Sequence, residues 1–167
     1  VLEPMRSLRL RLAANDSGLS CDLVYRMRSA CVEEDRQVLK NGATVFMDVM
    51  RFTQFGGWEG EIRIGDRVLR LEAGKVHGIR DRSWGRRAVG EPDAGVPAGP
   101  RQLYFLWAPL LWDDHATLSV FFENAAGHHL HAEGKRVPLR TDPAASPCIN
   151  DPDVQTMAGV TRKVAFV

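Results

Sequence analysis

The chain has 167 residues, 44% of them hydrophobic, and its 22 Lys and Arg nearly balance its 21 Asp and Glu, for a formal net charge of +1. This length and apolar content fit one globular domain with a substantial core, and the near-neutral charge argues against nucleic acid as a partner. No apolar run reaches the ~20 residues of a transmembrane helix and no signal peptide is evident, so we expect a cytoplasmic protein.

Alternation of apolar and polar residues predicts strands through the N-terminal half. Residues 8–12 and 19–27 alternate with a period of two and are joined by turn residues, which predicts an antiparallel pair. Residues 45–55 predict a strand that is apolar on both faces, as in a central strand or one that lines a cavity. The charged residues 31–40 lose the alternation and predict a helical turn or an irregular connection, and residues 55–60, rich in glycine, predict a turn.

The clearest hairpin lies at residues 61–71. Its two-residue loop, Gly65-Asp66, is of a kind that antiparallel hairpins favour. Counting outward from this loop pairs Ile62 with Leu69 on one face, which supports the register.

The C-terminal half is also expected to be β-structure. In chain order we expect an irregular Gly/Pro loop at 90–100, an edge or bulged strand at 103–112, a strand at 117–123, a hairpin with its tip at Glu133-Gly134, and a last strand at 160–167. About eight short strands with regular turn signals predict an all-β, antiparallel sandwich or barrel with little helix.

The stretch from His77 to Arg87 holds the densest chemistry. A buried carboxyl at Asp81 would have its neutral form favoured by desolvation and could donate a proton to an alkene or carbonyl. The alternative is a structural clamp, in which Asp81 pairs with an arginine and Trp84 caps the core. In an extended strand His77, Ile79, Asp81 and Ser83 share one face, and Arg80, Arg82, Trp84 and Arg86 share the other.

The segment Gly78-Ile79-Arg80-Asp81-Arg82-Ser83-Trp84-Gly85 resembles the signature of the hydroxyneurosporene synthase (carotenoid 1,2-hydratase) family and its AttH-like relatives. Its aspartate, tryptophan and final glycine match that signature. The resemblance implies a lipocalin-like β-barrel domain, usually one of two in tandem, that holds a long apolar ligand. It also implies that the aspartate is the proton donor for hydration of a double bond.

We therefore expect one lipocalin-like domain over residues 1–167, either a β-barrel or a strongly curved sandwich. It would bind an apolar isoprenoid-, polyketide- or lipid-like ligand, and a second β-domain of a longer chain is a further expected partner. Acid-assisted hydration or cyclisation is the enzymatic form of this hypothesis; a non-catalytic or structural domain is its alternative. No cofactor or metal is expected. The expected catalytic residues are Asp81 and His77, and the expected ligand-binding residues are Gln54, Phe52, Ile79, Trp84 and Arg80.

Two smaller features carry weaker signals. Cys21, Cys31 and Cys148 match no zinc or redox spacing and are expected to be buried free thiols. His129 and His131 would project to one face of a strand, but two ligands do not make a metal site, so an exposed polar face is expected there.

Overall fold

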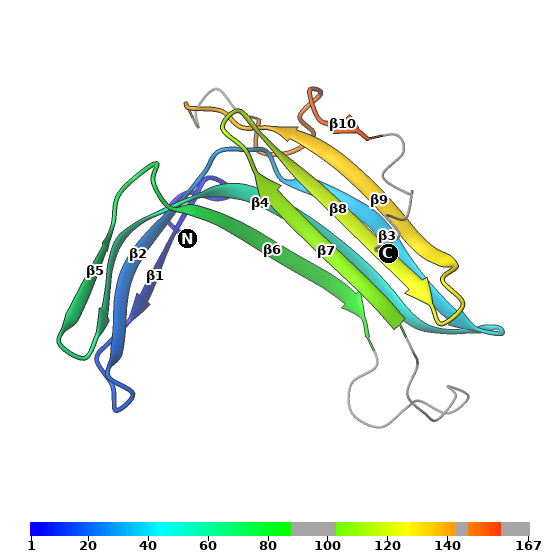
Figure 1. The fold of residues 1–167 in the computed structure, drawn as a ribbon, viewed down its shortest axis with the longest axis horizontal. Coiled ribbons are helices and arrows are strands. Elements are labelled where there is room, and N and C mark those ends of the chain that lie inside the picture. Colours follow the sequence, from blue (N-terminus) through cyan, green and yellow to red (C-terminus); the bar gives the residue numbers. More distant parts are fainter. Residues whose placement is uncertain (88–102, 143–146, 158–167) are drawn as a thin grey trace, which may run out of the picture.

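The computed structural model describes residues 1–87, 103–142 and 147–157. These residues form ten β-strands in two antiparallel sheets and contain no helix (Figure 1). The predicted all-β antiparallel class is confirmed. The strands are β1 (Ser7–Leu12), β2 (Leu19–Met27), β3 (Val32–Asn41), β4 (Thr44–Ile64), β5 (Arg67–Leu71), β6 (His77–Arg86), β7 (Leu103–Leu111), β8 (His115–Asn124), β9 (His129–Pro138) and β10 (Gln155–Thr156).

Strand β4 is the axis of the first sheet. Its 21 residues pair with β3 and β6 over the first half of the strand, and with β2 and β5 over the second half. β1 extends the second half by pairing with β2. The sheet is bent into an arch, with β1, β2 and β5 at one end (Figure 1).

The second sheet has the order β10-β9-β8-β7 and packs on the first half of the first sheet. Alternation along β8 places Leu118, Val120 and Phe122 in the core, where they meet Val32 of β3 and Phe55 of β4. Strands of one sheet do not pair with strands of the other in the described residues. The second half of the first sheet lies beyond this core.

Two glycines mark the bend of the arch. Gly56 of β4 pairs directly with Gly78 of β6, and aromatic rings lie over both. A Cβ on Gly56 would meet the ring of Tyr25, and one on Gly78 would meet the indole of Trp58. These two rings contact each other edge to face, with centroids 5.3 Å apart. Side chains at the glycine positions are therefore replaced by aromatic rings from neighbouring strands.

Three local predictions are wrong, because cross-strand pairing continues through residues whose local sequence predicts a break. Residues 31–40 are mostly strand β3, whose alternation is interrupted by register shifts after Glu34 and after Leu39. The predicted turn at 55–60 is part of β4. The predicted hairpin tip at Glu133-Gly134 lies inside β9, where ladder bonds to β8 continue.

Other predictions are confirmed. The hairpin at 61–71 has the expected pairing of Ile62 with Leu69. Residues 103–111 form β7, an edge strand of the second sheet. The loop expected at 90–100 and the strand expected at 160–167 lie outside the described residues. A helix capable of traversing a lipid bilayer is not found in the part of the chain that the structure describes.

Candidate functional site

The seven residues predicted for the site lie on opposite faces of the first sheet. We call the face that carries Phe55 the core face, because its first half packs on the second sheet, and the opposite face, which carries Leu23, the leucine face. Cross-strand partners share a face, so the pairing of β6 with β4 assigns every residue. The core face carries His77, Ile79 and Asp81, and the leucine face carries Phe52, Gln54, Arg80 and Trp84.

Asp81 is near an arginine and close to solvent. Its side chain is 45% exposed, and its Oδ1 lies 4.0 Å from Nε of Arg51. The guanidinium of Arg51 also lies 3.4 Å from the carboxylate of Glu34. Asp81 is thus the outer member of an ion-pair chain at the edge of the interlayer space. Its partner is an arginine of β4 and not one of the neighbouring arginines of β6. Ile79 packs against the core.

Gln54 is fully buried and acts as a structural tie. Its Nε2 donates hydrogen bonds to the carbonyls of Met5 (2.8 Å) and Ser29 (3.2 Å). Phe52 beside it is 8% exposed, and the Arg80 guanidinium lies over the Phe52 ring, 5.3 Å from its centroid. Trp84, which is 43% exposed, packs against the other side of this cluster.

Two buried carboxylates between the sheets, Glu34 and Glu133, were not among the predicted site residues. Burial raises the pKa of Glu34, although Thr53 donates a 2.8 Å hydrogen bond to it and Arg51 is close. Burial acts in the same direction on Glu133, but hydrogen bonds from His131, Lys135 and the Asp35 amide outweigh it and lower the pKa of Glu133. The sequence predicts a helical turn or an irregular connection at residues 31–40 and a hairpin tip at Glu133-Gly134, so it does not identify either glutamate as inward-facing.

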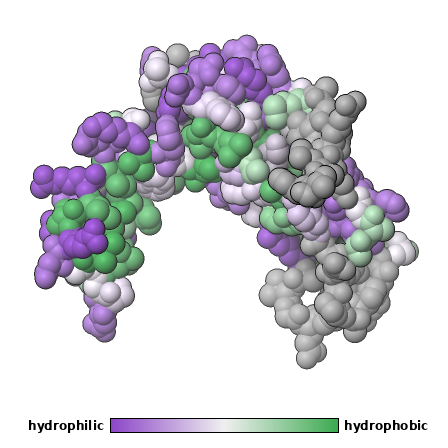
Figure 2. Space-filling model, in the orientation of Figure 1, coloured by the Kyte–Doolittle hydropathy of each residue, from purple (hydrophilic) through white to green (hydrophobic). Residues whose placement is uncertain are grey.

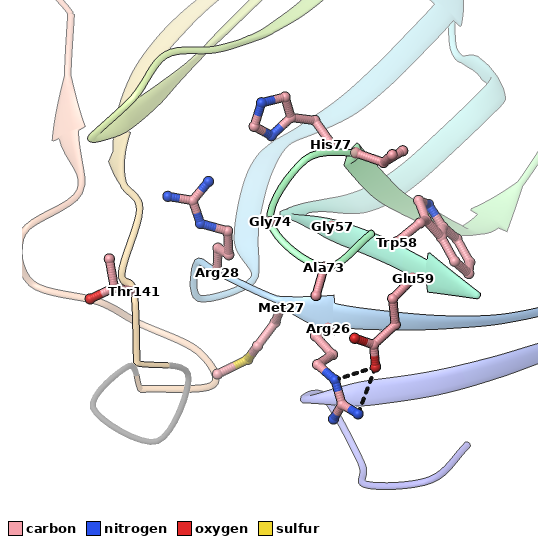
Figure 3. A pocket seen from close by; sticks show the side chains of 11 residues that line it. Arg26, Met27, Arg28, Gly57, Trp58, Glu59, Ala73, Gly74, His77 and Thr141 are labelled. Atoms are coloured by element: carbon pink, nitrogen blue, oxygen red, sulfur yellow. Dashed lines mark hydrogen bonds and ion pairs between the residues drawn. The ribbon is translucent and has the colours of Figure 1, made fainter. Parts of the chain in front are cut away.

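A pocket of about 390 Å³ lies on the core face at the bend of the arch (Figure 3). β2 contributes Arg26, the segment after it contributes Arg28, and β6 contributes His77. The connection between β5 and β6, which includes Ala73 and Val76, forms one wall. This volume falls within the range of small-molecule sites. Of the seven predicted site residues, only His77 lines it.

One of the two arginines that line this pocket has a carboxylate partner, and the other has none among the described residues. Arg26 is neutralised by Glu59, with both Nε and Nη2 lying 2.8 Å from Glu59 Oε1 (Figure 3). Arg28 makes one hydrogen bond, of 3.3 Å, to the carbonyl of Asp113. Within the described residues, neither Arg28 nor His77 forms an ion pair. Among the described residues that line the pocket, Arg28 is therefore a cation without a counter-charge.

A second feature is the leucine face of the second half of the sheet. Directly paired residues form apolar rows, because Leu10 pairs with Leu23, and Cys21 pairs with Ile62, which pairs with Leu69. Figure 2 shows hydrophobic residues gathered at this end of the arch. The large side chains left exposed on this face are Leu10 at 49%, Leu12 and Leu19 at 40%, Ile64 at 52% and Leu69 at 41%.

The opposite side of these strands is charged and internally paired. Arg9 forms a two-pronged ion pair with Asp22 across β1 and β2, and Arg63 pairs with Glu61 at 2.5 Å. This half of the sheet is thus amphipathic, with its apolar side uncovered by the described residues. Exposed apolar surface of this extent on a sheet is typical of a binding surface.

The sequence matches the family of unknown function DUF8625 over residues 1–167. The chain belongs to this family. No curated protein and no solved structure matches it. Membership of the hydroxyneurosporene synthase superfamily accordingly stays a prediction, and the chemistry of the two surfaces carries the functional argument.

The histidines of β9 have carboxylate partners. Nε2 of His129 lies 3.0 Å from Glu123 and Nε2 of His131 lies 3.3 Å from Glu133. A group of three or more metal-ligating side chains is not found in the described residues. The three cysteines are free, and Cys31 is buried.

Proposed function

We propose that this protein is a binding domain for an apolar, lipid-like small molecule, which lies along the leucine face of the first sheet. The observation that carries the proposal is the alignment of half-exposed leucines and isoleucines in directly paired rows on β1, β2, β4 and β5. Water contact with such rows is unfavourable by roughly 25 cal/mol for each Å² of apolar surface, so a ligand that covers them gains this free energy.

The same face continues along the sheet to the residues that the sequence singled out. Beyond Leu23 come the rings of Tyr25 and Trp58, and then Phe52 with Arg80 above it. Leu23, Tyr25 and Phe52 are themselves buried, at 8%, 1% and 8% exposed, so the ligand would contact the half-exposed rows in the second half of the sheet. In this proposal the bent sheet is the wall of a lipocalin-like site. Acid-assisted hydration or cyclisation through Asp81 and His77 stays a prediction. Both residues lie on the core face, opposite the face proposed for the ligand.

The test uses two adjacent residues of β5 that face opposite sides. Leu69 and Val68 are 41% and 40% exposed, and only Leu69 is on the leucine face. Binding of cis-parinaric acid is followed by fluorescence for wild type, Leu69→Asp and Val68→Asp. We expect Leu69→Asp to weaken binding by about tenfold, which is about 1.4 kcal/mol, and Val68→Asp to leave it unchanged.

Native mass spectrometry of the purified protein supplies an independent readout, because a tightly held apolar molecule adds its mass to the chain. Equal effects of the two substitutions on probe binding would contradict the proposal. So would a dimer that Leu69→Asp dissociates, because the leucine face would then be covered by a second copy.

A further inference from the structure

The pocket at the bend of the arch is a second site, separate from the leucine face. We infer that it binds a small organic carboxylate, whose charged group lies between Arg28 and His77. It lies on the core face of the sheet, so this inference is independent of the apolar ligand proposed above.

The sign of the ligand follows from the side chains around the pocket. Arg26 already has Glu59 as its counter-charge, with contacts of 2.8 Å. Within the part of the chain that the structure describes, the Arg28 guanidinium contacts only the Asp113 carbonyl, at 3.3 Å, which leaves most of its N–H donors available. His77 adds a second nitrogen donor or cation. An anion is the partner that this combination lacks.

The chemical class follows from the shape and the walls. Val76 and Ala73 give the pocket an apolar side, and Gly57 and Gly74 expose backbone where a larger residue would fill space. A guanidinium presents parallel N–H groups that match the two oxygens of a carboxylate. A compact ring or short chain that carries one carboxylate therefore satisfies both sides of a pocket of about 390 Å³.

Two features of the fold hold the backbone near Arg28 and His77 in place. The carbonyl of Arg28 accepts a 2.7 Å hydrogen bond from the amide of Arg140, which connects it to the segment that follows β9. The amide of Trp58 donates a 3.0 Å hydrogen bond to the carbonyl of Val76, which fixes the wall beside His77. The backbone around both groups is thus set before a ligand arrives.

The experiment compares benzoate with benzamide, which has the same shape without the charge, and with inorganic phosphate. Isotope-labelled protein is titrated with each probe and amide resonances are followed. We expect saturable shifts with benzoate at residues 57–59 and 73–77, and binding of benzamide and phosphate at least about tenfold weaker. Equal binding of benzoate and benzamide, tighter binding of phosphate, or no saturable benzoate shift up to its solubility limit would overturn the inference.

Variants assign the effect to the two named side chains. Arg28→Gln and His77→Gln should each weaken benzoate by about tenfold, and Arg28→Lys should weaken it less. Arg70→Gln, a charge change on the 83% exposed side chain of β5, is the matched control and should have no effect. If Arg28→Gln perturbs folding, His77→Gln decides alone, because His77 is exposed. Benzoate binding unchanged by His77→Gln and Arg28→Lys contradicts the assignment.

Discussion

The ring of Tyr25 lies against the α-carbon of Gly56, and its hydroxyl donates a 2.9 Å hydrogen bond to the carbonyl of Gln54 in the same strand. Tyr25 is 1% exposed, and burial raises the pKa of its phenol above the ordinary value. One buried aromatic thus fills the space that a side chain on β4 would occupy and satisfies a carbonyl at the bend.

Gly56→Ala should strongly destabilise the protein. The new Cβ would collide with the Arg26 carbonyl and lie 2.6 Å from Cζ of Tyr25, and neither neighbour can move freely. We expect a loss of at least about 2 kcal/mol in the free energy of unfolding, measured by urea denaturation. Gly65→Ala is the control, because no atom lies within 4 Å of its added Cβ and the cost is limited to its positive φ of 56°, about 1 kcal/mol. Similar losses for both variants would show that the ring does not constrain Gly56.

Leu118→Ala and Leu10→Ala should differ in their effects on stability. Leu118 is fully buried between the sheets, so its truncation should cost about 2–5 kcal/mol. Leu10, which is 49% exposed, should cost less than about 1 kcal/mol. Thermal and urea unfolding measure both. A larger loss at Leu10 would mean that the leucine face is covered in solution.

The two buried glutamates should give opposite dependences on pH. The pKa of Glu34 is raised in the folded state, so its contribution to stability is present at low pH and is lost as pH rises through that raised pKa. The pKa of Glu133 is lowered, so its contribution is present above the unfolded pKa and is lost as pH falls through the lowered value.

Between about pH 3 and pH 8, the two variants should therefore change in different parts of the range. Glu34→Gln should become more stable relative to wild type as pH rises above about 4.5. Glu133→Gln should become less stable relative to wild type as pH rises toward about 4.5, with little further change above that value. Urea midpoints across this range measure the difference between each variant and wild type. A common slope for the two variants would contradict the opposite shifts.

Cys31 should be the slowest of the three thiols to react with iodoacetamide. It is 7% exposed, and burial raises the pKa of its thiol to about 11, which leaves little thiolate near neutral pH. Peptide mass spectrometry after timed labelling of the native protein ranks Cys31 against Cys21 and Cys148. Loss of this order in urea is the control for burial, and labelling of Cys31 ahead of the others in native protein would contradict it.

Asp81→Asn tests whether the charge is needed for binding. Asp81 is on the core face and 45% exposed, with one arginine contact at 4.0 Å. We expect cis-parinaric acid affinity to stay within about twofold of wild type and stability to fall by no more than about 1 kcal/mol. A loss of probe affinity without unfolding would show that the Asp81 carboxylate takes part in ligand binding.

Sequence periodicity was sufficient to identify a strand where one side of that strand is apolar. It identified β1, β2 and β8, and the Gly65-Asp66 loop set the register of β4 with β5. It could not show which face the second sheet covers, because that depends on strands far along the chain. Gly56 resembled a turn residue in the sequence. A glycine is instead required there because the ring of Tyr25, from β2, occupies the space of a side chain, and the local sequence does not show this contact.

The candidate site shows the same limit. Alternation correctly separates His77 from Arg80 on β6, but the predicted site combines seven residues that lie on two faces of the sheet. The pocket combines β2, β6 and the connection before β6, a proximity that only the arch creates. Arg28 gave no sequence signal, because a single arginine after a strand is common on protein surfaces.

Along β4, the apolar phase changes at the bend. Val49 and Phe55 point to the core face, whereas Ile62 and Ile64, beyond the glycines, point to the leucine face. The number of residues between Phe55 and Ile62 therefore decides which face of the sheet each apolar side chain reaches. One residue inserted between Gly57 and Gly60 would turn the isoleucines toward the ion pairs and the glutamates toward the leucines. Length changes within DUF8625 proteins should therefore avoid this segment or occur there in multiples of two.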